Sequence, residues 1–205
     1  MGYWIGVVIM ERDKQIIQLY ADMISKKKKI YEAFLKLNET SKSTIKHCVD
    51  TAYISMSIGR GLGLKESQIS ELAYAALLHD IGKADIPIEI LNSTKSYSTE
   101  EFEEMKRHVQ YSEQYLKHIP RRIKRAILEH HENYNGSGYP EGKSSREISL
   151  YGKILRVADV IDALRTEKPY KKAVGRKEIL DYLDSKKGIL FDPAVVSATI
   201  NEFKI

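Results

Sequence analysis

Residues 72–83 read LAYAALLHDIGK, an apolar helical run that ends on an imidazole, a carboxylate and an ammonium group. An ionised carboxylate such as that of Asp80 is costly beside a buried helix end unless a positive charge meets it. A second stretch, ILRVADVIDAL (154–164), crowds Asp159 with aliphatic side chains in the same way. A divalent cation resolves both cases, because metal sites attract neutral imidazole and carboxylate together.

Helical spacing of apolar residues dominates the chain, and few segments alternate with the period of a strand. The Ser-x-x-Glu form of residues 98–101 indicates a capping box at the start of a helix. With no plausible sheet, we predict an all-α fold, a helical bundle with an N-terminal helical arm. Beyond the arm, helices are expected over about 44–60, 65–78, 99–118, 120–131, 148–165, 176–187 and 193–203.

Residues 1–40 are predicted to form the arm, and residues 41–205 the main domain. From Ile16 to Leu37 apolar residues recur in steps of four and three, interrupted by Lys27. This pattern leaves two interpretations open, a helix that forms a homodimer and an amphipathic helix that packs on its own domain. The arm is too short for a sensory domain, so the chain acts alone or is a piece of something longer.

The composition is that of an ordinary globular protein, with 42% hydrophobic and 30% charged residues in 205. The net charge of +5 is more typical of a solvated surface than of a nucleic-acid-binding face, so we expect no DNA or RNA partner. The single cysteine, Cys48, excludes an internal disulfide and fits a reducing, cytoplasmic location. The apolar opening, residues 1–10, is too short to span a bilayer and lacks the features of a secretion signal.

The doublet His130–His131 opens the stretch HHENYNGSGYPEG (130–142). Neighbours on a helix point about 100° apart, so they would not normally bind one ion from the same side. At a helix end each could bind a different ion, and Asp80 could bridge two ions about 3.5–4 Å apart, as in two-metal hydrolases. Taken alone, the doublet is also explained by a solvated helix terminus.

The chain resembles the HD-GYP branch of the HD-domain phosphohydrolases from about residue 41 to 203. An HD dipeptide alone is weak support, but the ordered set of motifs is highly specific. The motifs that carry the resemblance are HDIGK (79–83), His108, HHE with GSGYP (130–140), VADVIDAL (157–164), KPYKKA (168–173) and FDP (191–193).

This resemblance implies a cluster of metal ligands that holds two divalent ions. Ser43 stands where members with a third metal often carry a carboxylate, and His118 is left as a surface residue. Imidazole-rich sites with carboxylate accept iron, manganese, nickel or zinc, and the resemblance favours iron or manganese. The implied ligands are His47, His79, Asp80, His108, His130, His131 and Asp159.

The resemblance also implies a phosphodiesterase that hydrolyses cyclic di-GMP to linear pGpG or GMP, by attack of a hydroxide that bridges the two ions. Asp80 and Lys83 would be the catalytic residues, Lys83 by offsetting charge on the phosphoryl oxygens. The implied substrate-binding residues are Lys83, Asp162, Lys168 and Lys171.

Two departures from the family pattern leave alternatives open. Asn135 stands where the family usually has Asp, and Lys168 stands where it usually has Arg. A lysine cannot make the two-pronged phosphate contact that an arginine makes. The chain could instead be a weak or inactive module that binds a cyclic dinucleotide or a protein, or a phosphohydrolase for another cyclic dinucleotide or nucleotide. In the loop, Gly136 and Gly138 are expected to allow a sharp turn, and Tyr139 to line or support the cleft.

Overall fold

The computed structural model describes residues 11–167 and 172–203, and in these ranges it is all-α, as the sequence predicts. This part of the chain contains two isolated β-bridges and no strand. The helices are α1 (Glu11–Ser25), α2 (Lys28–Thr40), α3 (Lys42–Gly61), α4 (Glu66–Leu78), α5 (Ile88–Leu91), α6 (Thr99–Lys106), α7 (His108–Ser112), α8 (Arg121–Glu129), α9 (Leu150–Arg165), α10 (Arg176–Ser185) and α11 (Pro193–Phe203), with short 3-10 helices η1 (Ile81–Asp85), η2 (Glu113–Tyr115) and η3 (Ser145–Glu147).

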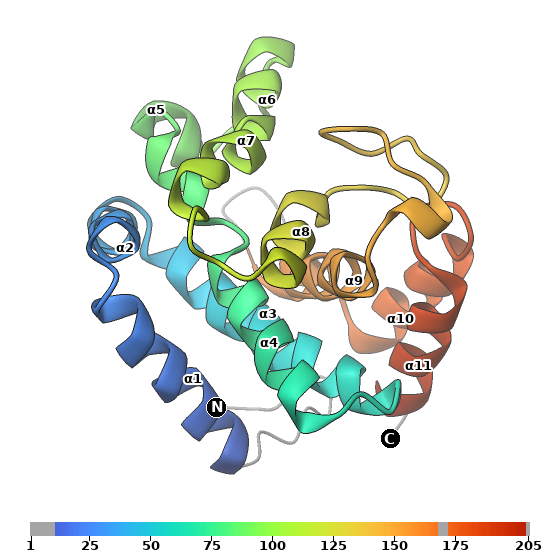
Figure 1. The fold of residues 1–205 in the computed structure, drawn as a ribbon. Helices are drawn as coiled ribbons and strands as arrows, with labels where there is room; N and C mark the ends of the chain where they lie inside the picture. The colour runs from blue at the N-terminus through green and yellow to red at the C-terminus, as the bar shows by residue number, and fades with distance from the viewer. Residues whose placement is uncertain (1–10, 168–171, 204–205) are drawn as a thin grey trace.

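Helices α3, α4, α8 and α9 form the centre of the molecule (Figure 1). On α9, Ile154, Val157, Ala158 and Ile161 follow helical spacing, and all four are fully buried. Burying a side chain of the size of Ile or Val contributes roughly 1.5–3 kcal/mol each. This apolar face fixes α9 against α3 and α8, and so fixes the direction in which Asp159 points.

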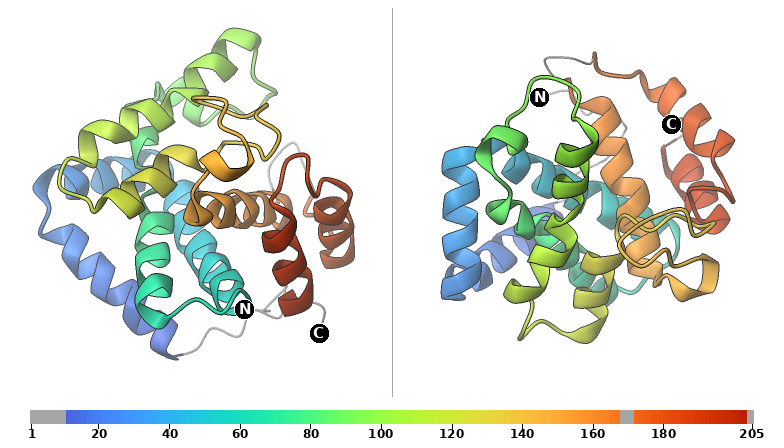
Figure 2. Two further views of the ribbon diagram at one scale, coloured as in Figure 1. Left: turned by 45° about the vertical axis from the view of Figure 1, so that its right-hand side comes forward. Right: turned by 90° about the horizontal axis from the view of Figure 1, so that it is seen from above.

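The remaining helices surround this centre. Helices α5 to α7 stand at one side and α10 with α11 at another, and the views in Figure 2 agree on this separation. The loop after α8 returns to the start of α11, because the N–H groups of Tyr134 and Asn135 donate to the carbonyls of Leu190 and Ile189. No helix in the described ranges is long and apolar enough to cross a bilayer.

The described part of the arm consists of two helices, α1 and α2, instead of one continuous helix. It breaks between Ser25 and Lys28, where Lys27 adopts non-helical backbone angles (φ −103°, ψ 87°). The ring of Tyr20 stacks on that of Tyr74 with centroids 4.4 Å apart, and its hydroxyl lies 2.9 Å from that of Ser70. Helix α2 buries Ile30, Ala33 and Leu37 and contacts α3 and η1. Both arm helices therefore pack on the rest of the chain, as the second interpretation of the heptad pattern describes, and a homodimer stays a prediction.

The single helix predicted over 99–118 is wrong, because the chain breaks at Arg107 into α6, α7 and η2. The predicted capping box at Ser98 is confirmed. At the break, Nδ1 of His108 donates to the carbonyl of Met105 at 2.7 Å and so competes with the helical hydrogen bonds. Close packing adds a second cause, since a Cβ on Gly82 would lie 2.0 Å from the carbonyl oxygen of His108.

Candidate metal centre

The ends of α4 and α8 meet α3, α7 and α9 at one cluster of imidazoles and carboxylates. All seven ligands predicted from the sequence belong to it, although they come from five separate segments of the chain. They are His47 on α3, His79 and Asp80 after α4, His108 at the start of α7, His130 and His131 after α8, and Asp159 on α9.

The carboxylate of Asp80 lies in the middle of the cluster and is 1% exposed. Its Oδ1 lies 3.4 Å from Nε2 of His108 and 4.0 Å from Nε2 of His130. Its Oδ2 lies on the other side, 3.7 Å from Nε2 of His47. Among the described residues Oδ1 has no hydrogen-bond partner. The two oxygens therefore face two sets of imidazoles, which is the arrangement of a bridging carboxylate.

The tautomers of three imidazoles follow from their backbone contacts. Each Nδ1 lies close enough to a carbonyl three residues earlier that it must carry a proton, so in each ring that is neutral the lone pair lies on Nε2. The pairs are His79 with Ala76 at 2.7 Å, His108 with Met105 at 2.7 Å, and His130 with Ile127 at 2.6 Å.

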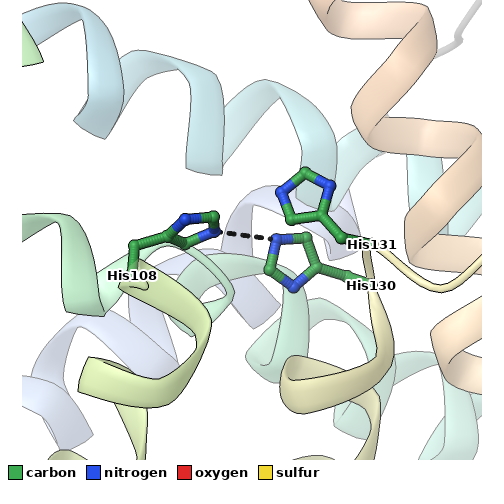
Figure 3. Close-up of side chains that lie close together, drawn as sticks. All are labelled: His108, His130 and His131. Atoms are coloured by element: carbon green, nitrogen blue, oxygen red, sulfur yellow. Dashed lines mark hydrogen bonds between the residues drawn. The ribbon is translucent and has the colours of Figure 1, made fainter. Parts of the chain in front are cut away.

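The Nε2 atoms of two of these rings, His108 and His130, face each other. The Nε2 atoms of His108 and His130 are 3.3 Å apart, the contact dashed in Figure 3. Burial is the main cause that lowers the pKa of His108 to about 4 and that of His130 well below its usual value, so both rings are neutral and neither Nε2 has a proton to donate. Two buried acceptors at this distance repel each other, and a cation bound by both removes the repulsion. The residues present therefore fit a metal ion.

The donor atoms form two groups that could each hold one ion, since the atoms within each group lie within 4.8 Å of one another. His131 completes one of them because α8 ends at Glu129, before the doublet. The rings of His130 and His131 lie with centroids 4.0 Å apart and turn toward His108 (Figure 3), so the helical separation of 100° does not apply. The groups are His108, His130 and His131, and His47, His79 and Asp80.

His47 is held between two carboxylates of α9. Its Nε2 lies 3.0 Å from Oδ1 of Asp159, and its Nδ1 lies 2.6 Å from Oδ2 of Asp162. Burial lowers the pKa of His47, but the hydrogen bonds with these carboxylates outweigh it and raise the pKa to about 9. Asp162 is 1% exposed, and its Oδ1 accepts from Nε of Arg165 at 2.8 Å. Asp162 thus orients His47, as carboxylates commonly orient metal-binding histidines, and its predicted contact with substrate stays a prediction.

Lys83 lies beside Asp80, with its Nζ 2.5 Å from Oδ2. Burial lowers the pKa of Lys83, but the charge of Asp80 outweighs it and raises the pKa, so the ammonium stays charged. The side chain is 22% exposed, so it is not fully enclosed by protein. The other two lysines predicted to bind substrate, Lys168 and Lys171, lie outside the described residues.

The loop after the doublet covers one side of the cluster. Tyr139 stacks on His131 with centroids 4.6 Å apart, as the sequence led us to expect of a supporting residue. Gly136 has a φ of 83°, and a Cβ on Gly138 would lie 2.3 Å from the backbone nitrogen of Asn133, so the turn requires both glycines. Asn135 is exposed, and its Oδ1 accepts from the backbone and hydroxyl of Ser137 within the turn.

Sequence reasoning missed Glu129, which precedes the doublet. This carboxylate is 1% exposed and accepts from the N–H of Ser149 at 2.7 Å, from Nε of Arg125 at 2.8 Å and from Nζ of Lys143 at 3.3 Å. Burial raises the pKa of Glu129, but these hydrogen bonds outweigh it and lower the pKa. Because Ser149 caps α9, Glu129 ties the end of α8 to the start of the helix that carries Asp159.

Arg156 was also missed, although it is the one basic residue within ILRVADVIDAL. Its Nε and Nη2 lie 3.1 and 3.0 Å from Oδ1 of Asn133, two residues after the doublet. His118, predicted to be a surface residue, is exposed.

An all-α fold with a buried histidine and aspartate centre that fits two cations defines a candidate metal-dependent hydrolase. A family model described as HD domain matches residues 15–195, and the chain therefore belongs to the HD domain family. The resemblance to the HD-GYP branch predicted from the sequence is confirmed.

The relatives of this chain include proteins named as phosphodiesterases of cyclic dinucleotides. It is 36% identical over 177 residues to a cyclic di-GMP phosphodiesterase of Thermotoga maritima, covering 82% of this chain and 48% of that protein. It is 28% identical over 214 residues to the 3'3'-cGAMP-specific phosphodiesterase 2 of Vibrio cholerae, covering 95% of this chain and 41% of that protein. The chain thus spans less than half the length of these relatives.

The solved structure of Bd1817, a HDG"Y"P protein from Bdellovibrio bacteriovorus, shares the fold with a TM-score of 0.65 at 22% identity. The match covers 78% of this chain and 52% of that one.

Proposed function

We propose that the chain is a metal-dependent phosphodiesterase that hydrolyses a cyclic dinucleotide, cyclic di-GMP in the first instance. The observation that carries the proposal is the convergence of buried acceptors without donors. Oδ1 of Asp80 and the Nε2 lone pairs of His108 and His130 face one another in the part of the chain that the structure describes. Such a cluster is unfavourable as a purely structural core and favourable as a cage for cations.

The seven clustered side chains would hold two divalent ions, iron or manganese first, with nickel and zinc as competitors. When bound, the ions would supply Lewis-acid activation of water and neutralise charge on the phosphoryl group. His47, His79, Asp80 and Asp159 would serve one side of the pair, and His108, His130 and His131 the other.

Three residues of the chain have distinct tasks in this proposal. Lys83 offers its ammonium to the phosphoryl oxygens, where developing negative charge is stabilised by fixed donors. Asp162 keeps the Nε2 of His47 turned toward the cluster through the 2.6 Å hydrogen bond at Nδ1. Tyr139 shields the ring of His131 from water on one face.

The choice of cyclic di-GMP rests on the names of the relatives, among which a 3'3'-cGAMP-specific enzyme also occurs. Both substrates carry two phosphodiester bonds, so the metal cluster alone does not discriminate between them. The pocket that contacts the bases would decide, and Lys168 and Lys171 belong to the segment that is not described.

The test is an anaerobic assay of the purified chain loaded with iron or with manganese. Cyclic di-GMP, 3'3'-cGAMP and cyclic di-AMP are supplied separately, and the products are resolved by chromatography. We expect pGpG or GMP from cyclic di-GMP, and no product from the Asp80→Ala variant. Binding of cyclic di-GMP without turnover would favour a binding module instead, and faster turnover of another substrate would reassign the specificity.

A further inference from the structure

We propose that Arg156 is a further phosphate-binding residue of this site, which contacts a phosphodiester group of the substrate from the side of α9. This inference rests on the proposed function and adds a residue to it.

The position of Arg156 brings its charge to the metal cluster. Arg156 lies three residues before Asp159 on α9, and residues with this spacing share a face of a helix. Its guanidinium reaches Asn133, at the start of the loop that follows His131. The guanidinium also lies over the ring of Phe191, with the Cζ of Arg156 5.7 Å from the ring centroid.

The guanidinium keeps most of its hydrogen-bonding capacity. It has five N–H donors in a planar fork, and a single acceptor, Oδ1 of Asn133, takes Nε and Nη2. Within residues 11–167 and 172–203, Nη1 has no hydrogen-bond partner. Asn133 thus contacts one side of the fork without neutralising its charge.

No carboxylate of the described residues forms an ion pair with Arg156, although its side chain is half-buried. Another partly buried arginine near the site, Arg165, is paired with Asp50 and Asp162. A partly desolvated cation without a counter-charge is unfavourable, and an anion that meets it recovers this free energy. Phosphates and carboxylates are the common anions that fit the planar guanidinium, because each can accept two parallel N–H···O bonds.

The charge of Arg156 lies at the side of the cluster that the loop after His131 covers. Arg156 is also among the charges that act on Tyr139, which stacks on His131. Lys83 is a second cation beside the cluster, where its Nζ contacts Asp80. The site therefore has two separate cations, enough to address two phosphate groups of one cyclic dinucleotide.

The experiment compares Arg156→Gln and Arg156→Lys with the control Arg121→Gln, which removes the same charge from an exposed position at the start of α8. Binding of cyclic di-GMP and of inorganic phosphate to the metal-free chain is measured by calorimetry, and metal content and melting temperature are measured for each variant. Arg156→Gln should raise the Kd of both probes by about tenfold or more, as expected on losing hydrogen bonds to a charged group. Arg156→Lys should recover part of the loss, and Arg121→Gln should match the unchanged chain.

A structural role of Arg156 predicts a different result, which Asn133→Ala isolates. This variant removes the hydrogen bonds between Asn133 and Arg156 but keeps the guanidinium, so it should retain most phosphate binding even where stability falls. Equal Kd values for Arg156→Gln and the unchanged chain, or an equal loss in Asn133→Ala, would overturn the inference. So would an unchanged chain that binds neither probe.

These outcomes are separate from the fate of the proposed function. A chain that binds phosphate through Arg156 but hydrolyses no cyclic dinucleotide would contradict the proposed function and leave Arg156 as an anion-binding residue. A chain that hydrolyses cyclic di-GMP equally well with Arg156→Gln, at unchanged KM and Kd, would keep the function and remove Arg156 from it.

Discussion

Replacing Asp162 by asparagine should weaken metal binding through His47 without removing any ligand. Oδ2 of Asp162 accepts the Nδ1–H of His47 at 2.6 Å, and Oδ1 accepts from Nε of Arg165 at 2.8 Å. Both contacts lie in a carboxylate that is 1% exposed, so water cannot replace either of them. Asparagine has one acceptor oxygen, and its amide N–H groups would face either the imidazole N–H or the guanidinium.

The size of the effect follows from these contacts. A buried hydrogen bond to a charged group contributes about 1.5–3 kcal/mol. Removing the carboxylate behind a metal-binding histidine typically lowers metal affinity about 10- to 100-fold, which equals about 1.4–2.7 kcal/mol. The two ranges agree, so we expect a rise of tenfold or more in the Kd of one ion. Calorimetric titration of the metal-free chain with manganese near neutral pH would measure it.

Asp50→Asn is the matched control. Asp50 pairs with the same arginine, with its Oδ2 3.1 Å from Nη2 of Arg165, but it does not contact His47. We expect its metal affinity to stay within about twofold of the unchanged chain, since exposed or partly exposed ion pairs contribute little. If Asp162→Asn bound manganese normally and raised only the KM for substrate, the orienting role would be refuted and the substrate contact predicted from the sequence would be favoured.

Four further substitutions test other parts of the centre. Asp80→Ala and His79→Ala should each lower the metal content per chain, measured by elemental analysis, and abolish hydrolysis; full metal content in both would contradict the ligand assignment. Lys83→Ala should keep its metal but slow turnover by about 10²-fold or more, the effect of removing one charge-stabilising donor, and a normal rate would exclude that role. Glu129→Gln should lower the free energy of unfolding in urea at pH 7 by about 2 kcal/mol, because charged hydrogen bonds to a buried carboxylate are lost. The folded-state pKa of Glu129 is lowered, so its contribution is present above the unfolded pKa of about 4.3 and is lost as pH falls through the folded pKa. The two proteins should therefore converge in acid, and a difference that persists there would show that the charge is not its cause.

The resemblance implied the full set of predicted ligands, and local patterns in the sequence indicated some of them independently. His79 and Asp80 end an apolar helical run, and Asp159 interrupts an aliphatic helix face. Buried charges of this kind are unfavourable without a counter-ion, so their presence in apolar segments indicates a metal before any geometry is known. The all-α class likewise follows from periodicity, which depends on neighbours three and four residues apart.

The breaks in the helices could not be predicted in this way. Apolar residues keep helical spacing on both sides of Lys27 and of Arg107, yet neither residue belongs to a helix of the structure. At Arg107 the deciding contacts are the bond from His108 to Met105 and the approach of Gly82 to the carbonyl of His108. The second of these joins segments that are distant in the sequence.

The sequence by itself therefore determined which side chains could bind metal and that helices carry them. Only the tertiary structure decided how those side chains are oriented. Asp162 meets His47 across 115 positions of the chain, and Glu129 meets Ser149 across 20. Arg156 forms no ion pair with a carboxylate of the described residues, which also depends on how the helices pack. A residue's type and neighbours in the chain fix what it can bind, whereas its partners depend on long-range packing that no local pattern encodes.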